Sequence, residues 1–250
     1  IQHYVPNFPV KAQPISTRQV MSHTAGFRNY QWCVCAPVWE VLNQKVYANV
    51  QESLSVFADA PLLFAPGTSF AYTSFGYNLT GAVIEGASGI SFNDYLQRAV
   101  LVPLQMQNTA LEETNHGLSK MARFYEVKGA EYKLAYPVNN SNKWPSGGIL
   151  STPADMVKLG IAVLGNEFLP AVVKDELFKV QTLSNGERNS QNYALGWRHS
   201  SQWPILNKTR TTTVLHHGGL AQGSSSVFML YPEFGLSLSL MMNKGTDQYN

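Results

Sequence analysis

The strongest constraint on the fold of this chain is a strand-turn-strand pattern close to the end of its 250 residues. Residues 225–231 and 236–242 are both rich in apolar residues, and the tetrapeptide Pro232-Glu233-Phe234-Gly235 between them is typical of a turn. The second segment alternates: Leu236, Leu238, Leu240 and Met242 face one way, and Ser237 and Ser239 face the other. This alternation predicts a hairpin in an antiparallel sheet with one covered face.

Further strands are expected at residues 193–199 and 212–217, while helical patterns fill the first two thirds of the chain. The clearest helix starts at Thr152-Pro153-Ala154-Asp155, which offers an N-cap, a proline at the first helical position and an early acid. The remaining elements are helices at 16–22, 37–58, 76–87 and 91–101 and short strands at 123–127 and 131–135. Helices followed by an antiparallel sheet predict an α+β fold rather than a doubly wound parallel sheet.

We expect a single domain over residues 1–250, with a helical lobe at about 15–165 and a sheet part at about 190–243. Lys and Arg number 18 against 16 Asp and Glu, a net charge of +2, and there is no basic tract, which argues against a nucleic-acid binder. Apolar runs stay below the roughly 18 residues of a membrane-spanning helix.

Metal and disulfide chemistry are weakly supported. Cys33 and Cys35 would close a strained ring as a disulfide, and two thiols alone make a poor zinc site, so we expect free thiols. His216 and His217 are neighbours on an expected strand and would point to opposite faces, which disfavours a shared metal ion. We expect no metal and no organic cofactor.

Four segments carry the functional signal when they are taken together. They are Ile15–Gly26, Pro66–Tyr77, Ser146–Met156 and His216–Gly219, the last followed by Gly223-Ser224-Ser225. In this order and spacing they resemble the penicillin-recognising serine hydrolases, which include class C β-lactamases and D-Ala-D-Ala carboxypeptidases, and most of all the LACTB-like branch. The resemblance implies a β-lactamase/transpeptidase-like fold, with an antiparallel sheet flanked by helices and an all-helical lobe.

Two of the three catalytic elements of that family match this sequence. Tyr72-Thr73-Ser74 stands at its Tyr-x-Asn element, and His216-His217-Gly218 stands at its Lys-Thr-Gly or His-x-Gly element. The resemblance implies that Tyr72 and His216 are catalytic and that Ser74, Gly218 and Gly219 bind substrate. Tyr72 would move a proton, and the backbone N–H of Gly219 would form half of an oxyanion hole.

Structural interpretations of the same residues stay open. Tyr72 could be a core aromatic residue, His216 a strand histidine with satisfied hydrogen bonds, and Ser74 a cap for a helix that begins at Gly76. Ser146-Gly147-Gly148 fits a structural turn. Tyr30, Trp32 and Trp144 could line the site or pack in the core.

The remaining element, Ser-x-x-Lys, occurs nowhere in the sequence. The resemblance places it upstream of Ile1 and a C-terminal helix beyond Asn250, so we expect the domain to be incomplete at both ends, with Leu236, Leu238 and Leu240 less covered. The leading hypothesis is a serine hydrolase that cleaves amide or ester bonds through an acyl-enzyme, with the nucleophile outside these residues. The alternative is a non-catalytic relative that binds peptide or peptidoglycan or assembles with other copies.

Partners and location follow from the same resemblance. We expect a small-molecule or peptide substrate and leave a homo-oligomer open. The family favours an exported protein, periplasmic or extracellular, or a mitochondrial one.

Overall fold

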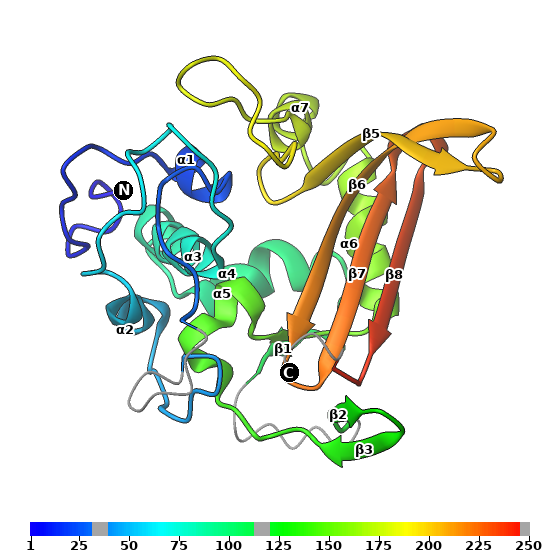
Figure 1. Ribbon diagram of the computed structural model, residues 1–250, viewed down its shortest axis with the longest axis horizontal. Helices are drawn as coiled ribbons and strands as arrows, with labels where there is room; N and C mark the ends of the chain where they lie inside the picture. Colours follow the sequence, from blue (N-terminus) through cyan, green and yellow to red (C-terminus); the bar gives the residue numbers. More distant parts are fainter. Residues whose placement is uncertain (32–39, 113–120, 246–250) are drawn as a thin grey trace.

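The computed structural model describes residues 1–31, 40–112 and 121–245. It consists of a helical part that lies beside a four-stranded antiparallel sheet (Figure 1). The α-helices are α1 (Thr17–Met21), α2 (Val50–Ser53), α3 (Ser74–Ser88), α4 (Phe92–Leu96), α5 (Trp144–Gly147), α6 (Pro153–Leu164) and α7 (Ala171–Phe178). Shorter helical turns are η1 (Leu54–Val56), η2 (Gln97–Leu101), η3 (Asn140–Lys143) and η4 (Pro232–Phe234).

The main sheet has the strand order β5-β6-β7-β8, so each strand pairs with its neighbour in the sequence. Its strands are β5 (Arg198–Ile205), β6 (Arg210–Ala221), β7 (Ser224–Tyr231) and β8 (Leu236–Met242). Two small two-stranded sheets pair β1 (Ala110–Leu111) with β4 (Ile149–Leu150) and β2 (Tyr125–Lys128) with β3 (Glu131–Leu134). The α+β class expected from the sequence is confirmed.

Two helix starts follow the capping rules that the sequence suggested. Ser16 accepts a hydrogen bond from the backbone N–H of Gln19, whose side chain in turn accepts one from the backbone N–H of Ser16, a complete capping box. Thr152 accepts the backbone N–H of Asp155 at 3.2 Å, and Pro153 opens α6. Both starts are set by residues within one turn, which is why the sequence alone predicts them.

The helix predicted over 37–58 is wrong over most of its described length. The described residues of that range form only α2 and η1, while 40–49 are irregular and 37–39 lie outside the described residues. Asn43 holds this irregular stretch, because its side chain accepts the N–H of Lys45 at 3.2 Å and donates to the carbonyl of Asn139 at 2.8 Å. Such local side-chain bonds compete with helix formation.

Two further boundaries differ from the sequence-based expectation. The helix expected at 76–87 begins at Ser74, so Ser74 is its first residue rather than its cap. The strand expected at 193–199 starts only at Arg198, because residues 194–197 form a tight turn in which the Ala194 N–H donates to the Trp197 carbonyl at 2.7 Å. Cys33 and Cys35 lie outside the described residues.

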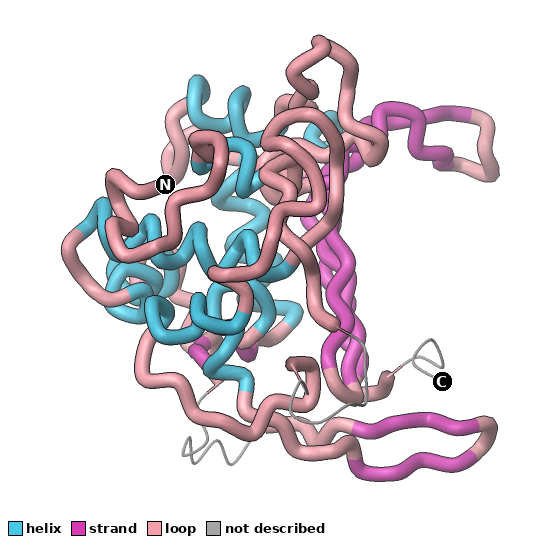
Figure 2. Tube along the Cα trace, turned by 60° about the vertical axis from the view of Figure 1, so that its left-hand side comes forward, coloured by secondary structure: helices cyan, strands magenta, loops and turns pink. Residues whose placement is uncertain are grey.

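Two hydrophobic cores hold the structure together. The larger core lies in the helical part and includes Phe27, Phe57, Phe75 and Leu79, each at most 2% exposed. The smaller core lies under the sheet, where Val163 of α6 meets Leu215 and Leu230. Figure 2 shows the sheet nearly edge-on, with the helical part on one side of it. No helix in the described ranges combines the length and apolarity needed to cross a membrane.

The two faces of β8 are covered unequally, as its alternating sequence predicts, and the covered face is the one that carries the serines. The serine face packs against α6, where a Cβ on Gly160 would collide with the side chain of Ser237, so the glycine permits the close approach. The apolar face is open instead, and Leu236 and Leu240 are 50% and 59% exposed. This exposure agrees with the expectation that these leucines have little cover.

The register of β6 leaves one of its edges open toward the helical part. Strand β5 pairs with β6 from Arg210 as far as His216, which lies opposite Arg198. Beyond that point, residues 217–221 pair only with β7 among the residues that the structure describes. Within those residues, the half of β6 that carries Gly218 and Gly219 therefore has a free edge on the side away from β7.

Candidate active site

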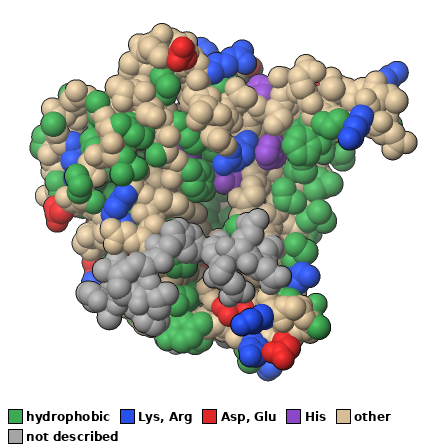
Figure 3. All heavy atoms as spheres, viewed as in Figure 1, with side chains coloured by type: hydrophobic (Ala, Val, Ile, Leu, Met, Phe, Trp, Pro, Cys, Tyr) green, Lys and Arg blue, Asp and Glu red, His purple; other side chains and the backbone are tan. Residues whose placement is uncertain are grey.

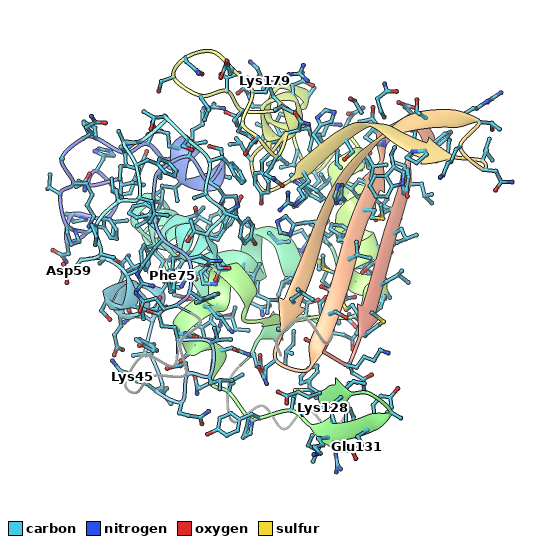
Figure 4. All side chains as sticks on the ribbon, in the orientation of Figure 1. Lys45, Asp59, Phe75, Lys128, Glu131 and Lys179 are labelled. Atoms are coloured by element: carbon cyan, nitrogen blue, oxygen red, sulfur yellow. The ribbon has the colours of Figure 1, made fainter. Side chains whose placement is uncertain are left out.

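Tyr72 stands at the entrance to α3 on a firmly held stretch of backbone. Thr73 donates its hydroxyl to the carbonyl of Arg28 at 2.6 Å, and the N–H of Ser74 donates to Oδ1 of Asn29 at 3.0 Å. Phe75, which is labelled in Figure 4, is fully buried and stacks on Phe57 with ring centroids 4.8 Å apart. These contacts fix the backbone of Tyr72, whose side chain remains 37% exposed.

The histidine beside Tyr72 is His217. The two rings lie 5.8 Å apart between centroids, with their planes 34° apart. His216 lies elsewhere: its Nε2 is 3.4 Å from the hydroxyl of Ser200, and its ring packs on Trp203. The structure thus brings Tyr72 together with the second histidine of the pair rather than the first.

Both ring nitrogens of His217 are engaged. Its Nδ1 lies 2.6 Å from the carbonyl oxygen of Gly218, which can only accept, so Nδ1 carries the proton. Its Nε2 lies 3.0 Å from the hydroxyl of Tyr193 and therefore accepts from it. Burial lowers the pKa of His217, and the nearby charge of Arg198 lowers it further. A neutral His217 with a fixed tautomer is the consequence.

Ser74 lies between two tyrosine hydroxyls. Burial raises the pKa of Tyr72, and hydrogen bonding by the Ser74 side chain and the charge of Arg198 oppose that increase. Burial raises the pKa of Tyr30 to about 12, against hydrogen bonding by Ser146 and Ser74. Both phenols are therefore protonated at neutral pH, and Ser74 is placed to interact with each of them.

Arg198 is a cation beside the histidines of this region, and the sequence analysis missed it. Its guanidinium lies over the ring of Tyr193, 5.8 Å from the centroid. After burial, its charge is the next cause that lowers the pKa of His216. Arg198 forms no ion pair with any described residue and donates to Oε1 of Gln191 at 2.5 Å. Its pairing with His216 across β5 and β6 is a register that no local sequence pattern specifies.

Histidine and basic side chains gather on one face where the helical part meets the sheet (Figure 3). In the part of the chain that the structure describes, His23, Arg198, His216 and His217 have no acidic ion-pair partner. Among the described residues, no group of three or more His, Cys, Asp or Glu side chains could hold a metal ion. The site is thus polar, aromatic and positively charged, with Tyr72 at its exposed margin and the open edge of β6 beside it.

Comparisons with known proteins agree on one family. The family model described as Beta-lactamase matches residues 1–249. Serine beta-lactamase-like protein LACTB, mitochondrial, from Mus musculus is 32% identical over 213 residues, which are 78% of this chain and 38% of that protein. The chain therefore spans well under half the length of this relative.

Solved structures share the fold over almost the whole chain. A D-stereospecific amidohydrolase from Streptomyces superposes with a TM-score of 0.78 and 22% identity, over 99% of this chain and 75% of the other. An octameric penicillin-binding protein homologue from Pyrococcus abyssi gives a TM-score of 0.72 at 20% identity, over 96% of this chain and 55% of the other. These likenesses confirm the expected β-lactamase/transpeptidase-like fold.

Proposed function

The chain belongs to the beta-lactamase family, and on that premise we propose that the protein containing it is a serine hydrolase. It would cleave amide or ester bonds through an acyl-enzyme intermediate. The nucleophilic serine would come from outside these residues, since no serine here is followed by lysine at the third position. The observation that supports this best is the contact between the rings of Tyr72 and His217, because His217 begins the part of β6 that has an open edge.

The residues of the site fit distinct parts of such a reaction. The serine oxygen would bond to the substrate carbonyl carbon, and the serine proton would pass through the hydroxyl of Tyr72 to the departing amine or alcohol. Water would then hydrolyse the ester, release the acid and restore the serine. The backbone N–H of Gly219 would form half of the oxyanion hole, and the N–H of the nucleophilic serine would form the other half. Ser74 would orient Tyr72 and the substrate.

The role assigned to His216 by the resemblance fits His217 better. His217 faces Tyr72, whereas His216 packs on Trp203. Because His217 is neutral, the positive field that favours proton release from Tyr72 would come from Arg198, which already counters the raised pKa of Tyr72. Arg198 would also attract a substrate with a carboxylate near the scissile bond, such as a peptide or a β-lactam.

The test uses the full-length protein and an activated ester such as p-nitrophenyl acetate. We expect a burst of product equal to one acyl group per molecule, followed by slow turnover. Tyr72→Phe should slow the burst by about 10²-fold or more. The matched control Tyr47→Phe removes a hydroxyl from a buried tyrosine of the helical part and should leave the burst unchanged. No burst from the unaltered protein would favour the non-catalytic alternative.

Location and assembly are further proposals. The similarity to the mitochondrial mouse protein LACTB supports a mitochondrial location, and the family also fits an exported protein. The octameric archaeal homologue supports a homo-oligomer. Fractionation of cells and light scattering of the purified protein would test these two proposals.

A further inference from the structure

His23 lies at the centre of the site in an environment that is energetically unfavourable for histidine. It follows α1 with a φ of 60°, in the left-handed region that few non-glycine residues adopt. Its side chain is 1% exposed, and its Nε2 is buried without a hydrogen-bond partner among the described residues. A strained backbone and an unpartnered buried polar atom both oppose folding, so stability alone does not account for histidine at this position.

His23 accepts hydrogen bonds from the residues on both sides of Tyr72. The carbonyl oxygen of His23 accepts the N–H of Ala71 at 2.9 Å, and its Nδ1 accepts the N–H of Thr73 at 3.2 Å. The residues immediately before and after Tyr72 are thereby fixed to one residue on another segment. Because Nδ1 accepts, a neutral His23 carries its proton on Nε2.

The imidazole ring of His23 also packs directly on the phenol ring. The centroids of His23 and Tyr72 are 4.4 Å apart, and His23 lies 4.5 Å from Tyr193. Tyr193 in turn donates to His217, whose ring faces Tyr72. Tyr72 is therefore held between two imidazoles, one on the helical part and one on β6. Neither ring offers a free lone pair to the Tyr72 hydroxyl, since Nδ1 of His23 and Nε2 of His217 are both occupied.

We propose that His23 is a positioning residue that fixes the hydroxyl of Tyr72 for proton transfer, through its Nδ1 bond to Thr73 and its ring contact. This inference rests on the proposed function. The charge state supports the geometry: burial first, and then the charges of His217 and Arg198, lower the pKa of His23 to about 3. The ring thus keeps its acceptor nitrogen throughout the neutral range.

Two variants of the full-length protein test the hydrogen bond to Thr73 and the ring contact with Tyr72 separately. His23→Phe keeps a ring beside Tyr72 but leaves the Thr73 N–H without an acceptor. His23→Asn keeps an acceptor atom at the position of Nδ1 and tolerates the left-handed backbone, but it loses the ring. We expect His23→Phe to lower the acylation rate constant by about tenfold to hundredfold with KM nearly unchanged, and His23→Asn to recover part of that loss.

A control and a second readout keep the test decisive. Phe92→Leu removes core volume at the start of α4, near the far end of α3 from Tyr72, and should lower the melting temperature while leaving the acylation rate constant unchanged. If His23→Phe does not fold, His23→Asn and the ¹⁵N resonances of His23 in the unaltered protein decide the matter. We expect those resonances to show the Nε2–H tautomer without titration between pH 5 and 8.

The outcomes are distinct from those that test the hydrolase itself. An unaltered protein that reacts with no acylating probe would overturn the proposed function, and the ¹⁵N spectrum would still show whether His23 holds Thr73. An active protein in which both His23 variants acylate at the normal rate would overturn the positioning role. A proton found on Nδ1 would overturn it as well, because Nδ1 could not then accept from Thr73.

Discussion

Nε2 of His217 lies 3.0 Å from the hydroxyl of Tyr193, which donates to it because the proton of this imidazole is on Nδ1. That proton is fixed by the carbonyl of Gly218, which can only accept. A buried tyrosine that the sequence analysis did not select therefore engages the second nitrogen of the histidine beside Tyr72 and holds its ring in place. In proteins, the hydrogen bond that one ring nitrogen of a histidine makes commonly determines the role of the other nitrogen.

Replacing Tyr193 by phenylalanine should release His217. Without the hydroxyl, Nε2 loses its donor while Nδ1 keeps its bond to the carbonyl of Gly218, so the tautomer is retained and the pKa of His217 rises. We expect ¹⁵N spectra of His217 to show the same Nδ1–H tautomer with titration at a higher pH, and an acylation rate constant lower by about tenfold. Tyr47→Phe is the matched control. A His217 whose titration is the same in the Tyr193→Phe variant would show that the Tyr193 bond does not stabilise the neutral imidazole.

Arg198 should determine which substrates are preferred. If it attracts a carboxylate near the scissile bond, Arg198→Ala should lower kcat/KM for carboxylate-bearing substrates by about 10²-fold, and Arg198→Lys should lower it less. Neutral esters should lose less, because for them only the effect of Arg198 on Tyr72 is removed. The comparison needs one ester series with and without a free carboxylate. Equal losses for both series would mean that Arg198 does not select substrates by their carboxylate.

The histidines of the site should make stability depend on pH. The pKa of His23 is about 3 in the folded protein and near 6.5 in an unfolded chain, so between these values the unfolded state binds an additional proton. Its contribution to stability is complete above about pH 6.5 and declines as the pH falls toward 3. His216 and His217, whose pKa values are also lowered by burial, add in the same direction.

Urea unfolding at several pH values between 7.5 and 4.5 measures this effect. His23→Asn should reduce the slope of unfolding free energy against pH by about 1.4 kcal/mol per unit over the lower part of this range. Ser55→Ala, at an exposed position without a titratable group, should leave the slope unchanged. An unaltered slope in His23→Asn would mean that His23 titrates near its ordinary pKa.

Asp155 should be one of the most sensitive positions for stability. It is fully buried, and its Oδ2 accepts the N–H of Asn108 at 2.8 Å and the hydroxyl of Thr109 at 3.0 Å. Asp155→Ala leaves the N–H of Asn108 without a partner, removes one of the two bonds of the Thr109 hydroxyl and breaks the ion pair with Lys158, so it should cost about 3 kcal/mol in unfolding free energy. Asp94→Ala, at the same helical position on the exposed start of α4, should cost under about 1 kcal/mol. Comparable losses at both positions would contradict the importance of burial at Asp155.

What the sequence predicts well here is local. The start of α6 at Thr152 and Pro153 and the β7–β8 hairpin around Pro232 depend on residues within a few positions of each other, and both are observed. Whether His216 or His217 lies beside Tyr72 depends on how β6 is placed against the helical part. Because neighbouring residues of a strand point to opposite faces, a shift of one residue exchanges the two histidines. His23 could not be selected from sequence, because its role rests on a left-handed backbone and on contacts with Thr73 and Tyr72.

The most direct test of the account is the intact mass of the full-length protein after reaction with a fluorophosphonate probe. We predict one covalent adduct per molecule, located on a serine outside these 250 residues, formed much more slowly in Tyr72→Phe than in Tyr47→Phe. No adduct on the folded protein, or an adduct formed at the same rate without the Tyr72 hydroxyl, would contradict a serine hydrolase that transfers its proton through Tyr72.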